Sequence, residues 1–271
     1  MQSKIWAITA YIFITLMTLI TLFPFVYMAF VSFMTYEELI SLKLIPSGFD
    51  LSNYKEVLGQ ASFVRYFLNT VYTATLSTLA TLCTTILATF AFVKLNFPGK
   101  KILLMILVCL LMVPYEVLVF CNYLTIAQWG LMNTYTGLIL PSTASVFYIF
   151  YLNSFLKMMS VTYYERARVV GASDLEFIVK ILIPLSKPGI CTVALLSFID
   201  GWNSFLWPML ITNDSNMRLL SDGLSAFSMQ TDRDFPLQMT ATTITTIPIV
   251  IFYFIFRNQI ISSVVNTGIK N

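Results

Sequence analysis

Long apolar stretches dominate the sequence, and short polar segments separate them. Residues 5–36, 66–93 and 235–256 contain no charged side chain, and neither do residues 117–156. A helix of about 20 residues crosses the hydrocarbon core of a bilayer, so each of the first three stretches predicts one crossing. The fourth is too long for one crossing. We divide it at residues 128–136, where Gly130, Asn133 and Thr134 predict a turn.

These patterns predict an all-α, polytopic membrane protein with six transmembrane helices in a single membrane domain over residues 1–271. We expect the spans at about 8–32, 66–93, 102–123, 137–156, 188–212 and 238–258. The apolar part of the first span is longer than that of a cleavable signal peptide, so it is interpreted as an uncleaved anchor.

The distribution of basic residues predicts the orientation. If the N-terminus lies inside, the inner segments hold 11 of the lysines and arginines and the outer segments hold 5. Cytoplasmic loops of membrane proteins carry the excess of basic residues. We therefore expect both termini to be cytoplasmic.

The composition agrees with a lipid environment and excludes several classes of function. The sequence is 58% hydrophobic and 11% charged, whereas soluble domains average about 25% charged residues. Its net charge of +3 is explained by the topology, so no nucleic-acid partner is expected. Histidine is absent from the sequence, which excludes a histidine-based metal or acid–base centre. The four cysteines, Cys83, Cys109, Cys121 and Cys191, fall within predicted spans and indicate neither a disulfide framework nor a metal site.

One polar segment, residues 162–187, interrupts the apolar pattern. It holds four of the sixteen basic residues and three of the thirteen acidic residues. Thr162-x-x-Glu165 has the form of a capping box, which predicts the start of a helix. Gly171 suits the left-handed conformation that ends a helix. A charged, helix-forming segment between two spans must face water, and we expect it to face another protein.

A second helix is predicted directly after Gly171. Ser173-x-x-Glu176 is another capping box, with two acidic residues at the positive end of the helix. Pro184 is expected to end this helix. Its apolar stripe is predicted to consist of Leu175, Ile178 and Leu182.

The same segment carries a family resemblance. Glu165-x-Ala167, Gly171 and then Ile181-x-Ile183-Pro184 resemble the EAA loop of ABC-importer permeases, whose pattern is E-A-A-x3-G-x9-I-x-L-P. Two positions depart from the pattern, because Arg166 replaces the middle alanine and Ile183 replaces leucine. The spacing is kept throughout.

The resemblance implies that residues 163–171 form a coupling helix, which docks on a cytoplasmic ATPase. Glu165 would then pair with a basic residue of the ATPase, and Gly171 would permit the turn. The alternative is that Glu165 only caps its own helix. The residues implied in coupling are Glu165, Arg166, Ala167, Gly171, Ile181, Pro184 and, in the C-terminal tail, Lys270.

The likeness continues along the chain. Phe198-Ile199-x-x-Trp202-Asn203-x-Phe205-Leu206-x-Pro208 resembles the corresponding segment of carbohydrate-uptake permeases of the maltose type. The chain would be the second of two permease subunits in a bacterial-type inner membrane. Its implied partners are a homologous permease, an ABC ATPase dimer that binds ATP and magnesium, and an extracytoplasmic solute-binding protein. This chain has no G-x4-G-K-[ST] motif, so we expect no cofactor on it and no enzymatic activity of its own.

Two carboxylates fall within predicted spans, where they are costly unless they face water or a partner. At the rise of an α-helix, Glu116 lies about 21 Å along span 3 and Asp200 about 18 Å along span 5. The similar depth predicts a polar chamber that faces outward. The residues that would line the substrate path are Tyr115, Glu116, Asn122, Tyr123, Asp200, Trp202 and Asn203. The alternative is that both acids bond to backbone or to a neighbouring subunit. Trp129 and Trp207 are interpreted as aromatic residues of the membrane interface.

The favoured function is import of a carbohydrate, expected to be an oligosaccharide, driven by a partner ATPase. A permease for glycerol phosphate or a polyol phosphate is the main alternative, although such an anion would favour a basic site and no basic residue lies deep in a predicted span. A carrier in which Glu116 and Asp200 transfer protons would leave the segment 162–187 unexplained. An intramembrane enzyme is disfavoured by the lack of histidine and of a clustered catalytic pair.

Overall fold

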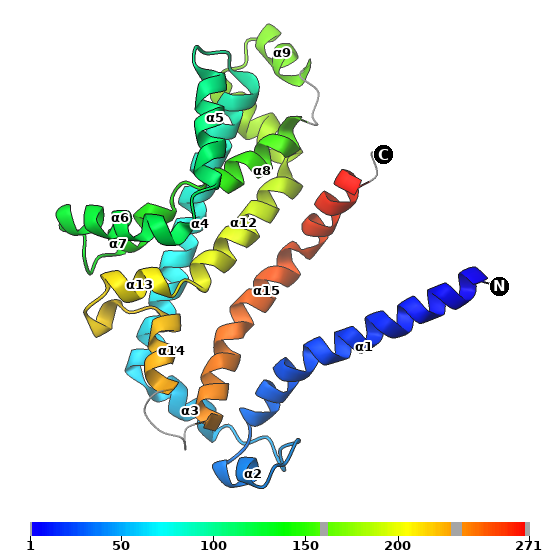
Figure 1. Cartoon of the computed structure of the whole chain (residues 1–271), viewed down its shortest axis with the longest axis vertical. Helices are drawn as coiled ribbons and strands as arrows, with labels where there is room; N and C mark the ends of the chain where they lie inside the picture. Colours follow the sequence, from blue (N-terminus) through cyan, green and yellow to red (C-terminus); the bar gives the residue numbers. More distant parts are fainter. Residues whose placement is uncertain (1, 158–161, 229–234, 269–271) are drawn as a thin grey trace. The chain divides into compact units, whose positions relative to one another are not determined.

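The computed structural model describes residues 2–157, 162–228 and 235–268, and every regular element within these ranges is a helix (Figure 1). The all-α prediction is therefore confirmed. The α-helices are α1 (Gln2–Val31), α2 (Tyr36–Ile40), α3 (Ser52–Gly59), α4 (Ala61–Lys94), α5 (Lys100–Leu111), α6 (Tyr115–Gln128), α7 (Tyr135–Ile139), α8 (Val146–Lys157), α9 (Thr162–Val169), α10 (Asp174–Phe177), α11 (Ile183–Leu185), α12 (Lys187–Trp202), α13 (Leu206–Ile211), α14 (Leu220–Ser228) and α15 (Phe235–Gly268). Two 3₁₀ turns, η1 (Leu140–Ser142) and η3 (Ser215–Met217), and a π-helical turn, η2 (Ile178–Leu182), complete the set.

The chain forms two compact units. Unit 1 comprises Met1–Arg65 and Asp222–Pro248, and unit 2 comprises Tyr66–Ser221 and Ile249–Asn271. The residues predicted for ATPase coupling and for the substrate path lie between residues 115 and 203, except for Lys270. All of them belong to unit 2.

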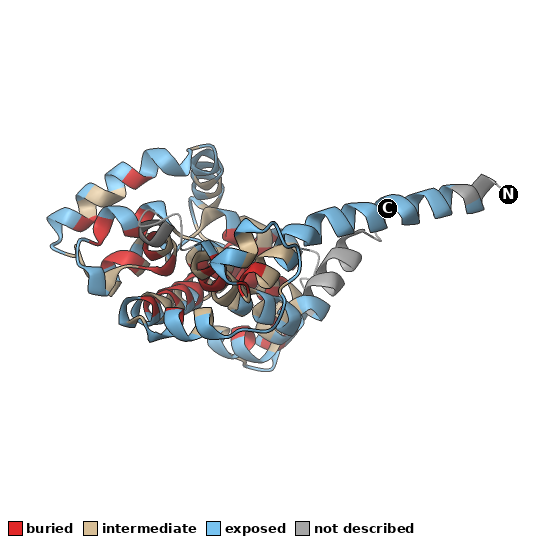
Figure 2. Cartoon of the chain, turned by 90° about the horizontal axis from the view of Figure 1, so that it is seen from below, coloured by how far each residue is buried: buried red, intermediate tan, exposed pale blue. Residues whose placement is uncertain are grey.

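Unit 1 is built where the end of α1 meets α3 and the start of α15. The backbone oxygen of Ser32 accepts hydrogen bonds from the Asn53 amide at 3.1 Å and from the Thr240 hydroxyl at 3.1 Å. Val31, Met34 and Val57 are fully buried around these bonds. Farther toward the N-terminus, none of the apolar window of α1 is buried within the chain, as its pale colour in Figure 2 shows. Such a surface requires lipid or another subunit to cover it.

Unit 2 is organised along α4, a single helix of 34 residues. Its buried face carries small hydroxyl side chains, which allow other segments to approach closely. The Thr81 hydroxyl donates to the Ser142 carbonyl at 2.6 Å, and the Thr84 hydroxyl to the Thr143 carbonyl at 2.5 Å. On α12, a Cβ added to Gly201 would lie 3.2 Å from the Cα of Ala74. These contacts make α4 the common packing partner of the broken segment 135–157 and of α12.

Three of the predicted spans are not straight helices. Residues 102–123 divide into α5 and α6, which are bent by 104°, and residues 137–156 divide at Ser142 with a bend of 45°. The first break lies at Pro114, which has no backbone N–H and disfavours a helical conformation for Val113. The span predicted at 188–212 divides after Trp202 into α12 and α13.

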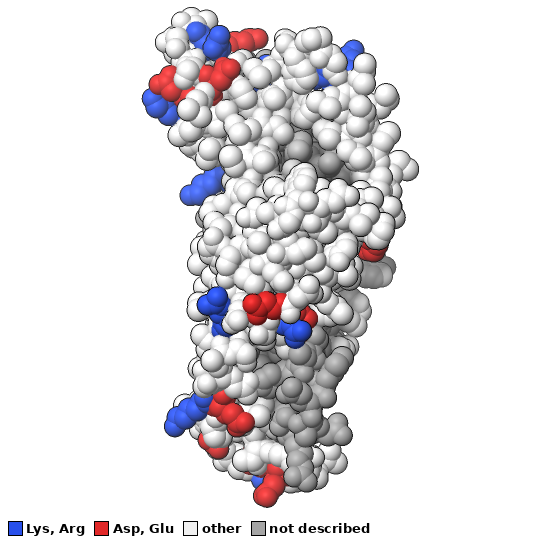
Figure 3. All heavy atoms as spheres, turned by 90° about the vertical axis from the view of Figure 1, so that its left-hand side faces the viewer, with Lys and Arg blue, Asp and Glu red and all other residues white. Residues whose placement is uncertain are grey.

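By length and composition, three helices can each cross a membrane: Trp6–Val31 in α1, Ala61–Lys94 in α4 and Phe235–Asn258 in α15. Three bent helix pairs, α5 with α6, the segment 135–157, and Asp174–Leu185 with α12, pass the same test only as pairs. On the face seen in Figure 3, charged side chains gather in a few groups with broad uncharged surfaces between them. The number of spans, their orientation and the single membrane domain remain predictions.

Candidate functional site

The predicted helix end at Gly171 is present. Gly171 has a φ of +82°, in the left-handed region. Its N–H donates to the Arg168 carbonyl at 3.0 Å, and the Ala172 N–H donates to the Ala167 carbonyl at 3.0 Å. This pair of bonds is the Schellman motif, which satisfies the last carbonyls of α9. The side chain of Thr162 lies outside the described residues, so the first capping box stays a prediction.

Side chains on the inner face of α9 attach it to the rest of unit 2. Ala167 is buried, and Tyr164 packs against Phe90 of α4 and Phe177 of α10. The ring centroids of Tyr164 and Phe177 are 5.0 Å apart at an interplanar angle of 77°, and those of Tyr164 and Phe90 are 5.8 Å apart at 74°. Edge-to-face packing of this kind is favourable beyond the area it buries. We refer to Phe90, Tyr164 and Phe177 as the aromatic trio.

Asp174 links the two sides of the Gly171 turn. The Tyr164 hydroxyl donates to its Oδ1 at 2.8 Å, and the Arg168 guanidinium lies 3.5 Å from the same oxygen. Burial, together with the hydrogen bond to Asp174, raises the pKa of Tyr164, so the phenol stays protonated and remains a donor. The turn is therefore fixed by side chains as well as by its backbone.

The second capping box is confirmed. The Ser173 hydroxyl accepts from the Glu176 N–H at 3.3 Å, and the Ser173 N–H donates to the Glu176 carboxylate at 3.0 Å. The Ser173 N–H, the Lys180 amine at 3.1 Å and the Ser173 hydroxyl at 3.1 Å all donate to this carboxylate and lower the pKa of Glu176 to about 2. The carboxylate is therefore ionised at neutral pH, and it anchors the start of α10.

The remainder of the second helix differs from the prediction in two respects. Leu175 is 67% exposed and does not belong to the apolar stripe, which consists of Phe177, Ile178 and Leu182. The helix does not end before Pro184, because it passes through η2 into α11 and then bends by 84° into α12. A π-helical turn, η2, precedes Pro184 in this helix. Ile181 packs partly buried against the core beside Leu182, whereas Pro184 is exposed.

The outer face of α9 is left uncovered by the chain. Glu165 and Arg166 are exposed, and Val169 and Val170 are 87% and 82% exposed. The inner face of this segment is thus buried, and its outer face combines charged side chains with two exposed valines. Such a surface has the form of a protein-docking site. Lys270 lies outside the described residues, so its predicted role has no structural account.

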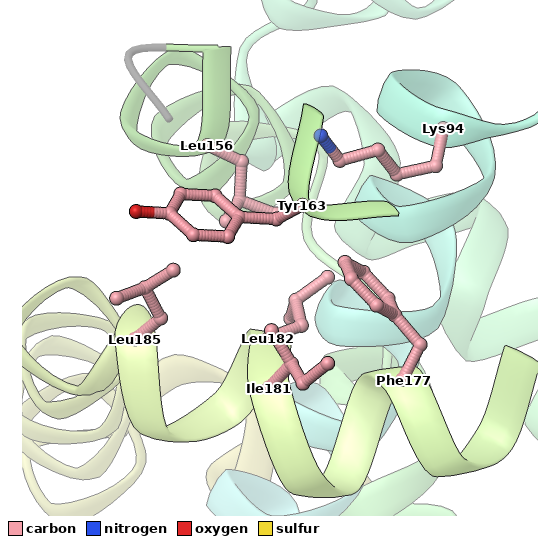
Figure 4. A pocket seen from close by; sticks show the side chains of 7 residues that line it. All are labelled: Lys94, Leu156, Tyr163, Phe177, Ile181, Leu182 and Leu185. Atoms are coloured by element: carbon pink, nitrogen blue, oxygen red, sulfur yellow. The ribbon is translucent and has the colours of Figure 1, made fainter. Parts of the chain in front are cut away.

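A shallow pocket, partly open to solvent, lies beside α9. In Figure 4 the Tyr163 ring lies opposite Leu182 and Leu185, and the Lys94 side chain extends toward α9. The other lining residues are Leu156, Phe177 and Ile181. With a single amine and otherwise mostly apolar walls, the pocket lacks the acceptors and donors that a sugar requires.

The residues predicted on span 3 lie beyond the bend. Tyr115 and Glu116 are exposed in the first turn of α6, so Glu116 does not lie at the depth expected for a straight span. That estimate was wrong because the chain turns by 104° before reaching it. Asn122 is half-buried, and Tyr123 packs against the cluster formed around Val119 and Trp207.

The residues predicted on span 5 occupy a different setting, at the end of α12. Asp200 accepts a hydrogen bond from the Tyr148 hydroxyl of α8. Trp202 is buried against Phe67 and Phe198, so its faces are not available as a sugar platform, whereas Asn203 is exposed. Within the described ranges no hydrogen bond or ion pair joins Glu116 to Asp200.

Several structurally important residues were not predicted. Trp207 is not an interface tryptophan, because it is buried and donates to the Gly137 carbonyl at 3.2 Å. Tyr148 and the aromatic trio were also missed. Among them, only Tyr164 had a sequence signal that could have predicted its role, since an aromatic residue within a charged helix suggests that the helix packs on the protein there.

Comparison with known proteins places the chain in a family. A family described as "Binding-protein-dependent transport system inner membrane component" matches residues 80–265, more than half of the chain. The chain is 31% identical over 260 residues to the trehalose/maltose transport system permease protein of Thermococcus litoralis, covering 94% of each. It is 31% identical to the sn-glycerol-3-phosphate transport system permease protein of Rhizobium meliloti, covering 92% of each.

Two further matches extend over almost the whole chain. The diacetylchitobiose uptake system permease protein of Streptomyces coelicolor is 26% identical over 268 residues, which cover 97% of this chain and 89% of the relative. A chain from the crystal structure of a bacterial ABC transporter that imports the acidic polysaccharide alginate shares the fold with a TM-score of 0.84. That match has 21% identity and covers 95% of this chain and 97% of the other.

Proposed function

Because the chain belongs to the family of binding-protein-dependent transport system inner membrane components, and is therefore a multi-pass permease subunit of an ABC importer rather than an enzyme, we propose that its segment 162–187 couples import to a partner ATPase. The observation that carries the proposal is the construction of α9. Its inner face is held by the aromatic trio and by Asp174, and its outer face presents Glu165 and Arg166 uncovered.

The proposed mechanism follows from how α9 is fixed. Closure of the ATPase dimer on ATP moves any rigid element docked on it. Because α9 packs directly against α4 through Phe90, a displacement of α9 acts on α4 without an intervening flexible linker. Gly171 and Ser173 then allow the chain to reverse into α10 without loosening this contact. The spans would move between inward-open and outward-open states.

The proposed substrate is a neutral carbohydrate, in the size range of an oligosaccharide. The relatives named above include permeases for trehalose and maltose, for diacetylchitobiose and for sn-glycerol-3-phosphate. The candidate substrate-path residues of this chain are acidic, aromatic or amide, and none is basic. A phosphate ester would be repelled by Glu116 and Asp200, so this set favours a sugar over glycerol phosphate.

The proposal includes three partners and a location. A second permease subunit would cover the exposed apolar helices, an ABC ATPase dimer would bind ATP and magnesium, and an extracytoplasmic binding protein would deliver the sugar to the outer loops. Both termini would face the cytoplasm of a bacterial-type cell, with the protein in its inner membrane.

Copurification in mild detergent, followed by mass spectrometry, tests the assignment of partners. We expect a second permease and an ABC ATPase in near-equal amounts with this chain. Uptake in proteoliposomes should then require ATP and the matching binding protein, with sugars preferred to glycerol phosphate. Isolation of this chain without an ATPase, combined with uptake that survives ATP depletion and collapses with a protonophore, would instead indicate a proton-coupled carrier.

A further inference from the structure

The loop between α2 and α3 carries a concentration of exposed large apolar side chains. Leu42 is 86% exposed and Phe49 is 82% exposed, and Ile40, Leu44 and Ile45 are 63%, 64% and 67% exposed. Single exposed apolar residues are ordinary on a protein surface, but a group of them in one loop marks a surface that contacts lipid or another protein. We refer to residues 40–49 as the apolar loop.

Polar groups in and before the loop bond to one another and fix its backbone. Thr35 and Glu38 form a capping box at the start of α2. The Glu38 carboxylate, in a side chain that is 17% exposed, also accepts from the Ser47 N–H at 3.1 Å, and the Lys43 amine lies 3.6 Å from the same oxygen. The Lys43 amine donates to the Ser47 hydroxyl at 2.7 Å. The loop thus holds together through its polar groups and leaves its large apolar side chains outside, which is the reverse of a loop built for water.

Leu42 is the most exposed of the five apolar residues, and its backbone conformation is unusual. Its φ of +56° lies in the left-handed region, which glycine and asparagine adopt more easily than leucine. A large apolar side chain at this position is therefore unfavourable for a loop surrounded by water. Its presence is explained if the side chain is covered by an apolar environment outside the chain.

The apolar loop lies where two helices of membrane-spanning length meet. Both α1 and α15 contain an apolar window long enough to cross a membrane. The Ser32 carbonyl accepts from the Thr240 hydroxyl at 3.1 Å, so the end of α1 is level with the first turns of α15 (Figure 1). The Phe49 ring packs edge-on against Phe33, with 5.3 Å between the ring centroids and an interplanar angle of 81°. The loop is therefore held next to the ends of both helices, at the boundary of the bilayer that they cross.

We propose that the apolar loop inserts its side chains into the bilayer at the headgroup boundary and anchors the adjoining end of α1 at a fixed depth. Lipid is favoured as the partner because the loop continues the surface of α1, whose apolar window has no buried residue within the chain. Amphipathic elements in this boundary bury their apolar side about 5–10 Å deep. In the predicted orientation the leaflet concerned is the outer one. The proposal depends on neither the ATPase nor the transported solute.

Quenching by labelled lipids tests the contact. One genetically encoded fluorescent amino acid at a time replaces Leu42, Leu44 or Phe49, and the chain is reconstituted with its partner subunits in vesicles of phosphatidylethanolamine and phosphatidylglycerol. Part of the lipid carries a nitroxide quencher, either near the headgroup or deep in the acyl chain. We expect quenching at all three positions, stronger with the shallow nitroxide than with the deep one.

Positions on α1 and α9 provide the controls. Met17 and Leu19 lie near the centre of the apolar window of α1, on nearly opposite faces of the helix. A label at one of them at least should be quenched more strongly by the deep nitroxide. Val169 is 87% exposed, as bare as Leu42, but lies in segment 162–187. A label there should be quenched by neither lipid, and equal quenching at positions 42 and 169 would contradict the proposal.

Anchoring is tested by a label at Val26, which is near the end of α1 and 47% exposed. In the double variant Leu42→Ser with Leu44→Ser, the ratio of shallow to deep quenching at position 26 should change, because the end of α1 is no longer held at one depth. Val169→Ser with Val170→Ser removes two equally exposed apolar side chains elsewhere and should leave the ratio unchanged. An unchanged ratio in the Leu42 and Leu44 variant would overturn the anchoring.

The other outcomes identify what covers the loop instead of lipid. Labels at positions 42, 44 and 49 that are shielded from both nitroxide lipids and from iodide in the water would show that a protein partner covers the loop, and would overturn the proposal. Labels that only iodide quenches would place the loop in water, with the same consequence. The label on α1 reports lipid contact in the same vesicles, so a negative result at the loop is decisive.

Discussion

Substitution of Gly171 gives a prediction whose magnitude follows from the backbone alone. Gly171 has a φ of +82°, and a Cβ added there would meet nothing within 4 Å. Steric conflict with neighbouring groups therefore contributes nothing, and only the local conformational preference remains. An L-residue in the left-handed region costs about 1–2 kcal/mol, and asparagine costs less than alanine. Proline cannot adopt this φ and also removes the N–H that bonds to Arg168.

The series Gly171→Asn, Gly171→Ala and Gly171→Pro should uncouple transport in that order. A cost of about 1–2 kcal/mol lowers the population of the intact turn by roughly 5–30-fold relative to the unfolded turn. The assay is the number of ATP molecules hydrolysed per sugar imported by proteoliposomes. We expect the ATP-to-sugar ratio to rise modestly for asparagine and more for alanine. For proline we expect ATP hydrolysis without measurable import.

Gly99 provides the matched control. It has a φ of +80° with open space around its Cβ position, and it lies between α4 and α5 rather than in segment 162–187. Gly99→Ala should lower the thermal stability about as much as Gly171→Ala does and leave the ATP-to-sugar ratio unchanged. The reasoning is refuted if Gly171→Ala couples normally, or if Gly99→Ala uncouples to the same degree.

Three further predictions concern other parts of the account. Glu165→Lys should abolish uptake while membrane insertion stays normal, and Glu165→Gln should reduce it less; equal uptake by wild type and Glu165→Lys contradicts docking by α9. A Cβ at Gly137 would lie 2.3 Å from the Leu131 carbonyl oxygen, so Gly137→Ala should lower the melting temperature sharply, whereas Gly48→Ala, with open space, should not. The pKa of Glu176 is lowered from 4.5 to about 2, so its stabilising contribution is complete above about pH 4.5 and is lost only as the pH falls toward 2. Glu176→Ala should therefore lower the melting temperature equally at pH 6 and pH 8. A loss of melting temperature that grows between those values contradicts the lowered pKa of Glu176.

Local signals predicted the turn at Gly171 and the helix start at Ser173 well. Gly171 and the pair Ser173–Glu176 act through bonds to residues three to five positions away, so their spacing alone carries the information. The attachment of α9 was not predictable in the same way. The trio joins Phe90, Tyr164 and Phe177 across as many as 87 residues, and no periodicity in a single segment indicates which aromatic residues meet.

The structural setting of the candidate substrate-path residues was predicted less well, for a related reason. Glu116 was placed by counting along a straight helix, whereas the chain bends at Pro114, two residues before it. A proline near a helix end does not by itself set the direction in which the chain continues, because tertiary contacts decide it. Trp202 was selected for its chemistry, but its burial against Phe67 and Phe198 depends on the packing of α4 against α12.

Site-specific photo-crosslinking in whole cells tests the central claim most directly. A photoreactive side chain is placed at Val169, on the exposed face of α9, or at Ser215, in the exposed turn between α13 and α14. We predict that position 169 crosslinks to a cytoplasmic ABC ATPase and position 215 to the extracytoplasmic binding protein. Crosslinks to the opposite partners, or no ATPase adduct at 169 while 215 reacts, would contradict the coupling role of residues 162–187.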